Sequence, residues 1–289
     1  MSSVRACYLC GENEFRKRTG RVRDNPNLDV LECCSCGLVF LSSFSHLKEG
    51  LYEDGGMHDN EIDVDLNAWI RETERDDERR FNWIRPLIEG KAILDFGCGA
   101  GMFLKKTKGI AKSAIGIEPE KRLKEHFNKE GLNVACSLDD LNERFDIITL
   151  FHVLEHLTDP ARVLKELSSK LYENGEIIVE VPNADDALLT LYQSKPFSEF
   201  TYWSRHLFLY TESTLARLAE KTELRINYIK QVQRYTISNH LYWLAIGKPG
   251  GHKEWHFMDS DQLNKAYEKQ LAYVGRCDTL LGSFSRKQV

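Results

Sequence analysis

The sequence predicts an α/β protein with a doubly wound, seven-stranded and mostly parallel sheet, a small N-terminal appendage and a C-terminal helical tail. Two observations predict this fold. Short apolar segments alternate with helical patterns along residues 91–250, which is typical of parallel strands joined by helices. The first apolar segment, residues 91–95, runs directly into the glycine-rich turn 97–101, and ligand-binding α/β sheets carry such turns after a strand.

Seven segments have the apolar character of buried strands. They are residues 92–95, 114–118, 134–136, 145–150, 176–181, 225–232 and 241–246. No helical pattern separates the last two, so we expect them to pair as a hairpin. Residues 66–89 have helical spacing, and Pro86 predicts a break there. Asp159 and Pro160 suit an N-cap and a first helical residue, which predicts a helix through Leu171.

A chain of 289 residues is long enough for one large core and a small appendage. We expect a ribbon-like segment (1–45), a connector with leading helices (46–90), a main domain (91–250) and a helical tail (251–289). The tail is a candidate for a homodimer contact. Residues 1–7 lack the apolar core of a signal peptide and no apolar run could span a membrane, so we expect a cytoplasmic location and no membrane partner.

The net charge of −5 gives no general attraction to nucleic acid or to anionic lipid. Residues 16–23 form one basic cluster, which we interpret as the solvated surface of a hairpin. Two C-x-x-C-G turns flank this polar segment, and cysteines paired in this way in a cytosolic protein indicate metal rather than disulfides. The expected zinc ligands are Cys7, Cys10, Cys33 and Cys36.

Cys34 lies between the last two of these ligands and remains an alternative member of the set. A closed shell of four thiolates has no open position for a substrate, so we expect a structural zinc ion that helps a small segment to fold. Three further cysteines, Cys98, Cys136 and Cys277, are isolated in the sequence. We interpret them as small buried residues.

The glycine spacing indicates which class of cofactor binds. A dinucleotide fingerprint has a third glycine where this chain has Met102, and that glycine helps to seat a pyrophosphate at a helix N-terminus. Glu118 ends the second strand, where a carboxylate can accept hydrogen bonds from both hydroxyls of a ribose. The sequence therefore predicts a nucleoside pocket without a phosphate cradle.

Three parts of the sequence together resemble the signature blocks of class I S-adenosylmethionine-dependent methyltransferases. They are residues 95–101, Glu118 and residues 145–156. The resemblance covers roughly residues 80–247 and implies S-adenosylmethionine as cofactor. Ligands of open α/β sheets lie beyond the carboxyl ends of the strands, which selects the residues expected at the cofactor. They are Asp95, Gly97, Cys98, Gly99, Gly101, Glu118, Leu138, Phe151 and His152.

Two of these assignments keep alternatives. Asp95 either fixes the glycine turn or contacts the methionine amino group through water. The adenine amino group meets either the backbone at Leu138 or the side chain of Asp139 or Asp140.

Residues 152–156 also spell H-x-x-E-H, an inverted zinc-protease motif. That motif needs one continuous helix, but a strand is expected to end at His152.

The segment 183–210 is the expected substrate lid, because it follows the fifth strand and is rich in aromatic residues that could stack on a sugar or form an ordinary apolar flap. His206 is the candidate general base, and His152 is a second candidate catalytic residue facing the cofactor. The block around His206 resembles a Glu-His-Leu-x-Tyr block of zinc-containing sugar C-methyltransferases. Arg205 stands at the glutamate position, which favours O-methylation over C-methylation. The alternative for His206 is a structural histidine that fixes the lid.

We therefore expect an S-adenosylmethionine-dependent methyltransferase that methylates a hydroxyl of a sugar or nucleotide-linked sugar in polysaccharide biosynthesis, with a small molecule as its partner. Two other hypotheses remain. The chain could be a zinc-ribbon methyltransferase of ribosomal RNA, with residues 16–23 at phosphates. It could also be a non-catalytic module that binds cofactor or a partner protein.

Overall fold

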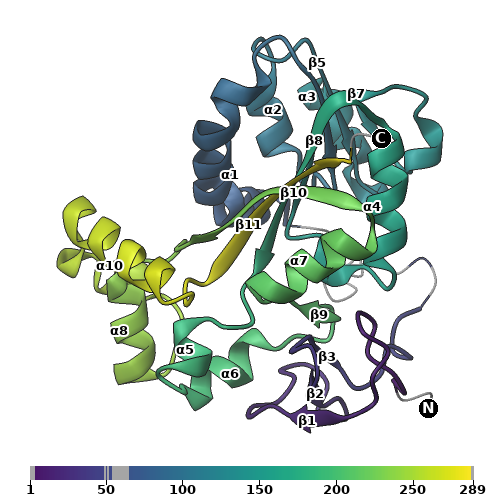
Figure 1. The fold of residues 1–289 in the computed structure, drawn as a ribbon. Coiled ribbons are helices and arrows are strands. Elements are labelled where there is room, and N and C mark those ends of the chain that lie inside the picture. Colours follow the sequence, from purple (N-terminus) through teal and green to yellow (C-terminus); the bar gives the residue numbers. More distant parts are fainter. Residues whose placement is uncertain (1–3, 49, 51, 54–64, 288–289) are drawn as a thin grey trace. The chain divides into compact units, whose positions relative to one another are not determined.

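The computed structural model of the chain describes residues 4–48, 50, 52–53 and 65–287 (Figure 1). It divides into two compact units, each made of several chain segments. The first unit comprises Met1–His46, Leu154–Ala161 and Glu180–Gly282, and the second comprises Leu47–Val153, Arg162–Val179 and Ser283–Val289. Most of the connector expected before residue 65 lies outside the described residues. The four-part organisation expected from the sequence stays a prediction.

The predicted seven-stranded sheet is confirmed, with the strand order β10-β11-β8-β7-β4-β5-β6. Its strands are β4 (Ala92–Phe96), β5 (Ser113–Ile117), β6 (Val134–Ala135), β7 (Phe145–Phe151), β8 (Leu171–Pro182), β10 (Leu224–Val232) and β11 (Thr279–Arg286). Strand β4 pairs in parallel with β5 and β7, and β5 pairs in parallel with β6. Strands β5 and β6 therefore lie on one side of β4, and β7 lies on its other side. The strand order reverses between β4 and β7. Such a reversal opens a ligand crevice at the carboxyl ends of the two strands.

The helices of the second unit fit the crossover pattern. They are α1 (Leu66–Ile88), α2 (Met102–Thr107), η1 (Lys121–Leu123), α3 (Lys124–Glu130), η2 (Leu138–Asp140) and most of α4 (Pro160–Ser169). The helix expected after Asp159 is confirmed as α4, but it ends at Ser169 instead of Leu171, which begins β8. The break expected at Pro86 is wrong, because α1 continues through this residue. Pro86 stands in the last turn, where the missing amide removes a hydrogen bond only at the frayed end of the helix.

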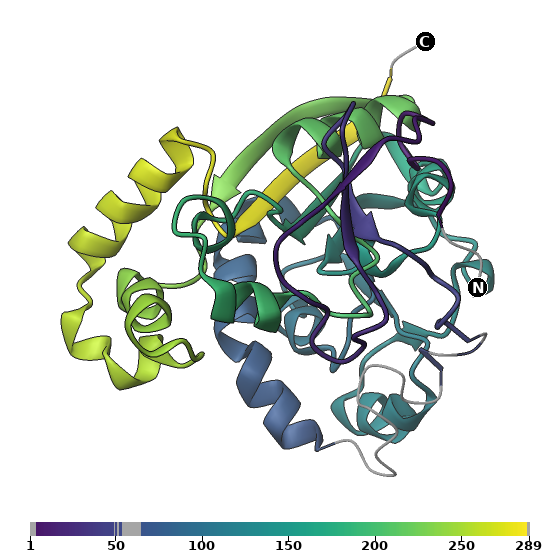
Figure 2. The same cartoon turned by 90° about the horizontal axis from the view of Figure 1, so that it is seen from below.

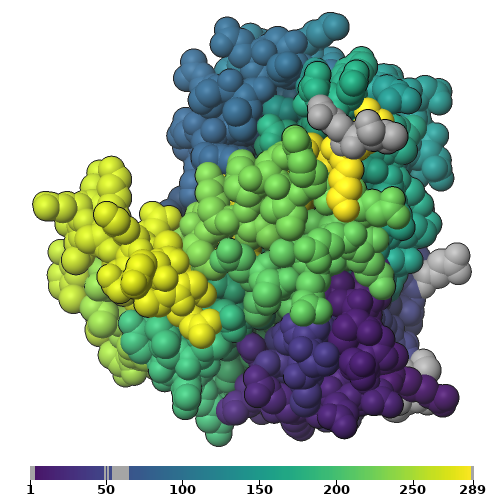
Figure 3. All heavy atoms as spheres, in the orientation of Figure 1, coloured from purple at the N-terminus to yellow at the C-terminus, as the bar shows by residue number. Residues whose placement is uncertain are grey.

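The first unit contains a second, four-stranded sheet in the order β1-β2-β3-β9. Its strands are β1 (Phe15–Lys17), β2 (Val30–Cys33), β3 (Val39–Leu41) and β9 (Phe208–Leu209). All three pairings are antiparallel, and β9 joins β3 with Phe40 opposite Phe208. The N-terminal hairpin and the expected lid segment thus share one sheet. In Figure 3 the purple N-terminal segment also lies against the green helix α7 (Glu212–Lys221), where Lys221 Nζ donates to the Tyr8 carbonyl at 3.0 Å.

The last predicted strand is wrong. Residues 241–246 belong to the helix α8 (Ile237–Ile246), and the seventh strand is β11, near the C-terminus. The tail is helical as expected in α10 (Asp261–Tyr273), but the residues from Thr279 to Arg286 form this strand. Strands β10 and β11 are sheet neighbours, although three α-helices and one short 3₁₀ helix separate them in the chain instead of a hairpin turn. A six-residue apolar run fits a buried strand or a buried helix equally well, so the pattern did not distinguish them.

The remaining helices of the first unit are η3 (Leu154–His156), α5 (Ala187–Thr190), α6 (Lys195–Thr201), α9 (Gly251–Glu254) and η4 (His256–Met258). Helices α8 and α10 lie side by side (Figures 1 and 2). The hydroxyl of Tyr267 in α10 lies 2.8 Å from His240 Nδ1 in α8, which links the two. Among the described residues, no helix is both long and apolar enough to cross a membrane.

Candidate active site

The glycine turn that follows β4 is held tightly to the end of β5. The amides of Gly97 and Cys98 both donate to the carbonyl of Ile117, at 2.8 and 3.0 Å. Gly97 has φ +76°, and a Cβ there would lie 2.5 Å from Val153 Cγ2. Gly99 has φ +52°, and a Cβ there would lie 3.0 Å from the Trp69 ring. The turn therefore requires glycine for its backbone conformation and for its close packing.

Glu118 follows β5 and links its end to the glycine turn. Its Oε2 accepts a hydrogen bond from the Gly99 amide at 2.9 Å, and its Oε1 accepts one from the Glu120 amide at 3.1 Å. Burial raises the pKa of the Glu118 carboxyl, and the two amide hydrogen bonds oppose that shift. Each oxygen keeps a second lone pair, so the carboxylate can still accept hydrogen bonds from a ligand hydroxyl. This geometry fits the ribose contact expected from the sequence.

Asp95 lies on β4 directly opposite Thr149 of β7, at the reversal of strand order. Its side chain is 3% exposed, and its Oδ1 accepts a hydrogen bond from the Thr149 hydroxyl at 2.7 Å. Burial raises the pKa of Asp95 to about 7, and the Thr149 hydrogen bond lowers it. The carboxyl therefore changes charge near neutral pH, where a cationic ligand would favour its ionised form.

The sequence analysis missed two buried charges on α1. Arg80 Nη1 lies 3.3 Å from Asp77 Oδ1, and the Arg80 guanidinium stacks over the Phe151 ring at 4.9 Å from its centroid. Burial raises the pKa of Asp77, and the adjacent Arg80 lowers it. Both residues lie in a charge-rich part of the sequence. Their spacing from Ile84 and Ile88 was the available signal, because all four share the buried side of the helix.

His152 directly follows β7 and has a left-handed conformation, with φ +56°. This conformation is uncommon for a residue other than glycine, and it concentrates at functional sites. Strand β7 therefore stops at Phe151, and the next helical turn is the short η3. No continuous helix spans the H-x-x-E-H segment, which excludes the inverted zinc-protease hypothesis. Of the other expected cofactor residues, Leu138 lies half-buried in η2 and Cys98 in the glycine turn.

In the first unit, Glu155, His156 and His206 form a polar cluster, which we call the Glu-His-His cluster. One donor atom from each residue lies within 4.8 Å of the other two. The His156 and His206 ring centroids are 5.0 Å apart, and the Trp203 ring lies 5.4 Å from that of His206. Glu155 is completely buried and His156 is 8% exposed. The sequence analysis singled out His206 but did not bring it together with the other two.

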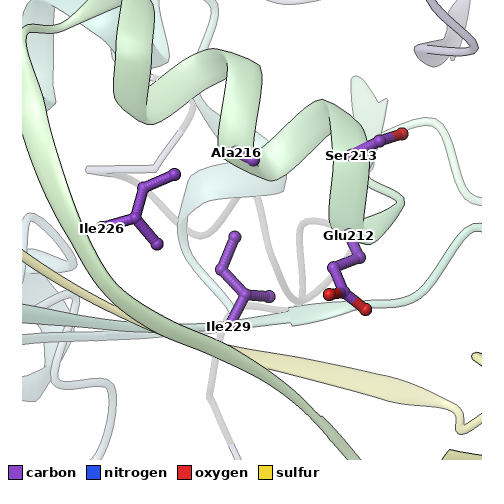
Figure 4. A pocket seen from close by; sticks show the side chains of 5 residues that line it. All are labelled: Glu212, Ser213, Ala216, Ile226 and Ile229. Atoms are coloured by element: carbon purple, nitrogen blue, oxygen red, sulfur yellow. The ribbon is translucent and has the colours of Figure 1, made fainter. Parts of the chain in front are cut away.

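The aromatic residues of the lid segment pack mainly into the first unit. Tyr202, Phe208 and Tyr210 are each at most 2% exposed, so these rings are core residues and are not available to stack on a substrate. Trp203 is half-buried, and the Arg23 guanidinium lies 4.8 Å above its ring. A shallow, mostly apolar hollow of about 420 Å³ lies between α7 and β10 (Figure 4). Its lining contains only one titratable group, Glu212, so we assign no chemistry to it.

The four expected zinc ligands converge in the first unit. The sulfur atoms of Cys7, Cys10, Cys33 and Cys36 all lie within 4.8 Å of one another. The Sγ atoms of Cys7 and Cys36 are 3.4 Å apart, too far for a disulfide and close to the roughly 3.8 Å that tetrahedral zinc requires. Cys34 is exposed and lies outside this group. The residues present therefore fit a zinc ion.

Comparisons with known proteins agree with this fold. A solved S-adenosylmethionine-dependent methyltransferase from Thermotoga maritima superposes with a TM-score of 0.53 over 82% of this chain and 100% of that one, at 19% identity. One from Archaeoglobus fulgidus gives 0.52 over 77% of this chain and 100% of that one, at 21% identity. Residues 70–228, more than half of the chain, match the family described as "Methyltransferase domain". The chain belongs to this family.

The protein is an S-adenosylmethionine-dependent methyltransferase, and its curated relatives carry methyltransferase names as well. A tRNA U34 carboxymethyltransferase of Campylobacter hominis is 29% identical over 74% of this chain and 80% of its own length. A ubiquinone biosynthesis O-methyltransferase of Coxiella burnetii is 28% identical over 33% of this chain and 45% of its own length. The chain thus spans most of the first relative but less than half of the second.

Proposed function

We propose that this methyltransferase transfers the methyl group of S-adenosylmethionine to a hydroxyl oxygen of a small polar acceptor, with a sugar or nucleotide-linked sugar as the favoured class. The observation that carries the proposal is the position of His206 beside Glu155 and His156. A histidine next to a buried carboxylate is suited to hold a proton taken from a hydroxyl, because the carboxylate stabilises the imidazolium.

In this proposal the second unit holds the cofactor. Glu118 accepts hydrogen bonds from the ribose hydroxyls, and the turn from Gly97 to Gly101 lets the backbone approach the ligand closely. Asp95, ionised, faces the positive methionine ammonium. S-adenosylmethionine supplies an activated methyl group on a sulfonium. The fit rests on the buried Asp95 carboxylate, on the half-buried Glu118 carboxylate and on a turn that a Cβ would obstruct.

His206 then acts as the general base. It takes the proton of the acceptor hydroxyl while the oxygen attacks the methyl carbon, and the electron pair of the broken carbon–sulfur bond stays on sulfur. A positioned base of this kind contributes about 10²–10⁴-fold to the rate.

A tRNA acceptor is the second candidate, and the name of the Campylobacter relative favours it. The charges of the basic cluster at residues 16–23 argue against it, because acidic partners neutralise most of them. The ion pairs are Arg16 with Glu32, Arg18 with Glu32, Lys17 with Asp29, and Arg21 with Glu199. A phosphate-binding surface needs positive charge that is not already paired. We therefore favour the small acceptor.

We also propose that Cys7, Cys10, Cys33 and Cys36 hold a structural zinc ion. Four thiolates complete a tetrahedral shell, so this ion would organise the N-terminal strands and take no part in methyl transfer. The role is consistent with the sheet in which β3 pairs with β9, two residues after His206.

A transfer assay with radiolabelled S-adenosylmethionine tests the proposed function. The acceptors are a panel of nucleotide sugars, a panel of small phenols and unmodified tRNA, each at low and physiological salt. We expect label in a small hydroxyl compound. Label only in tRNA, with a steep loss as salt rises, would favour the second candidate. Tight cofactor binding without any transfer would favour the non-catalytic hypothesis.

A further inference from the structure

We propose that the Glu-His-His cluster binds a divalent transition-metal cation, distinct from the zinc of the four cysteines. Two imidazoles and one carboxylate offer three donor atoms within 4.8 Å of one another. Zinc ligands bound at about 2.1 Å in a tetrahedron are roughly 3.4 Å apart, so rotations of these side chains would suffice to close the shell. Carboxylate and imidazole donors in this ratio form catalytic metal sites that keep open positions.

The backbone brings these donors together from two distant segments. The Leu207 amide donates to the Glu155 carbonyl at 2.8 Å, which places His206 beside η3. The His206 amide donates to the Trp203 carbonyl at 3.0 Å and closes a turn. Ser204 anchors this turn, since its hydroxyl donates to Asp24 Oδ2 at 2.6 Å. The donors thus sit on a backbone that is fixed before any ligand binds, which favours metal affinity.

A second observation concerns the buried hydroxyl of Tyr210, which interacts electrostatically with Glu155 of the cluster. Tyr210 is 1% exposed, and its hydroxyl makes no hydrogen bond among the residues that the structure describes. Burial and the nearby Glu155 carboxylate raise its pKa. A buried hydroxyl without a partner destabilises the folded state. A metal-bound water or acceptor oxygen would give the Tyr210 hydroxyl a partner.

The donor set indicates which cations fit. Imidazole suits zinc, iron, copper and nickel, whereas magnesium, calcium and manganese prefer oxygen ligands. The cluster carries one negative charge from Glu155 when both imidazoles are neutral, so a dication leaves a net charge of about +1. Three protein ligands leave at least one position for an oxygen of the acceptor.

This inference rests on the proposed function and changes the role of His206 from base to ligand. An acceptor hydroxyl bound to the cation would lose its proton to solvent, because a cation lowers the pKa of a bound hydroxyl group. Its oxygen would then form the new bond to the methyl carbon, and the carbon–sulfur electron pair would stay on sulfur. The products are the methyl ether, S-adenosylhomocysteine and one proton.

Metal analysis of the full-length protein tests the inference. We expect two metal ions in each wild-type chain and one in Glu155→Gln and His206→Asn. The control is His256→Ala, which removes an exposed histidine outside the cluster and should keep both ions. Cofactor binding by each variant verifies folding. A Co²⁺ titration of wild-type protein that retains its cysteine-bound zinc then measures the second site directly.

We expect the Co²⁺ affinity to fall more than about 100-fold in Glu155→Gln. Removing a metal ligand weakens metal binding more than removing a hydrogen bond that supports a ligand. The new absorption should lack the thiolate-to-cobalt band that marks the cysteine site. Equal metal content and equal Co²⁺ affinity in wild type and both cluster variants would overturn the inference. If the wild-type protein still transferred methyl groups in that case, the proposed function would stand. Metal binding without transfer to any acceptor would support the inference and contradict the proposed function.

Discussion

The hydroxyl of Thr149 donates a 2.7 Å hydrogen bond to Asp95, across the parallel pair of β7 and β4. This bond fixes the carboxyl at the point where the strand order reverses. It also opposes the effect of burial, which raises the pKa of Asp95 to about 7. The charge of Asp95 is therefore sensitive to pH near 7.

We predict that cofactor affinity rises with pH up to about 7 and is constant above it. S-adenosylmethionine carries positive charge, so it binds best when Asp95 is ionised, and binding below pH 7 releases a proton. The affinity changes at most tenfold for each pH unit. Calorimetric titrations between pH 5.5 and 8.5 measure this dependence.

Two variants check the assignment of this pH dependence. Asp95→Asn should remove it, and Thr149→Val should move the midpoint to higher pH because the hydrogen bond that favours the ionised carboxyl is lost. The same raised pKa makes the ligand-free protein lose stability as pH rises from about 4 to about 7, since the folded state keeps a proton that the unfolded state releases. An unchanged midpoint in Thr149→Val would contradict the account.

Glu118→Gln should weaken cofactor binding about 10–100-fold. The amide of glutamine places an N–H donor against the Gly99 or Glu120 amide, and charge-assisted hydrogen bonds contribute about 1.5–3 kcal/mol. Calorimetry measures the change. Glu125→Gln, an exposed neutral substitution on α3, is the matched control and should bind like wild type.

Gly97→Ala should abolish detectable cofactor binding, while Gly109→Ala should not. Both glycines have φ near +77°, so both substitutions carry a backbone cost of about 1–2 kcal/mol. Only Gly97 also has a neighbour, the stiff Val153 side chain, at 2.5 Å from the new Cβ. Thermal melting should show destabilisation of both variants, larger for Gly97→Ala because of its clash with Val153, and only Gly97→Ala should lose cofactor binding. Equal affinities would show that the turn tolerates a side chain.

Removal of zinc should destabilise the N-terminal strands. Cys7→Ser breaks the four-thiolate shell, so we expect loss of one metal ion and a lower melting temperature of the first unit. Cys34→Ser changes an exposed cysteine in the second cysteine turn, residues 33–36, and should keep both metal content and stability. Amide exchange of β2 and β3 locates the effect. Full zinc content in Cys7→Ser would contradict the ligand assignment.

Much of the sheet could be predicted from the sequence, because buried parallel strands leave continuous apolar runs between turn residues. The errors have physical reasons. The run at 241–246 is apolar on all sides and packs as α8, with Gly247 ending the helix in a left-handed conformation. Strand β11 contains Gly282, Ser283 and Ser285, and these small residues concealed a buried strand.

The site was predictable only in part. The spacing of nearby residues located the glycine turn, Glu118 and the cysteine turns, because each of these features is recognised by residues that are close together in the sequence. The Glu-His-His cluster joins residues about fifty positions apart, and a tertiary hydrogen bond from Leu207 to Glu155 brings them together. Arg80 and Asp77 were missed because a charged helix face normally faces water.

The most direct test of the central claim compares methyl transfer and cofactor affinity in wild type, His206→Ala and the surface control His256→Ala. The account predicts that His206→Ala loses at least about 100-fold in kcat, while its affinity for S-adenosylmethionine stays within about twofold of wild type and His256→Ala is unchanged. Turnover by His206→Ala at the wild-type rate would contradict the account.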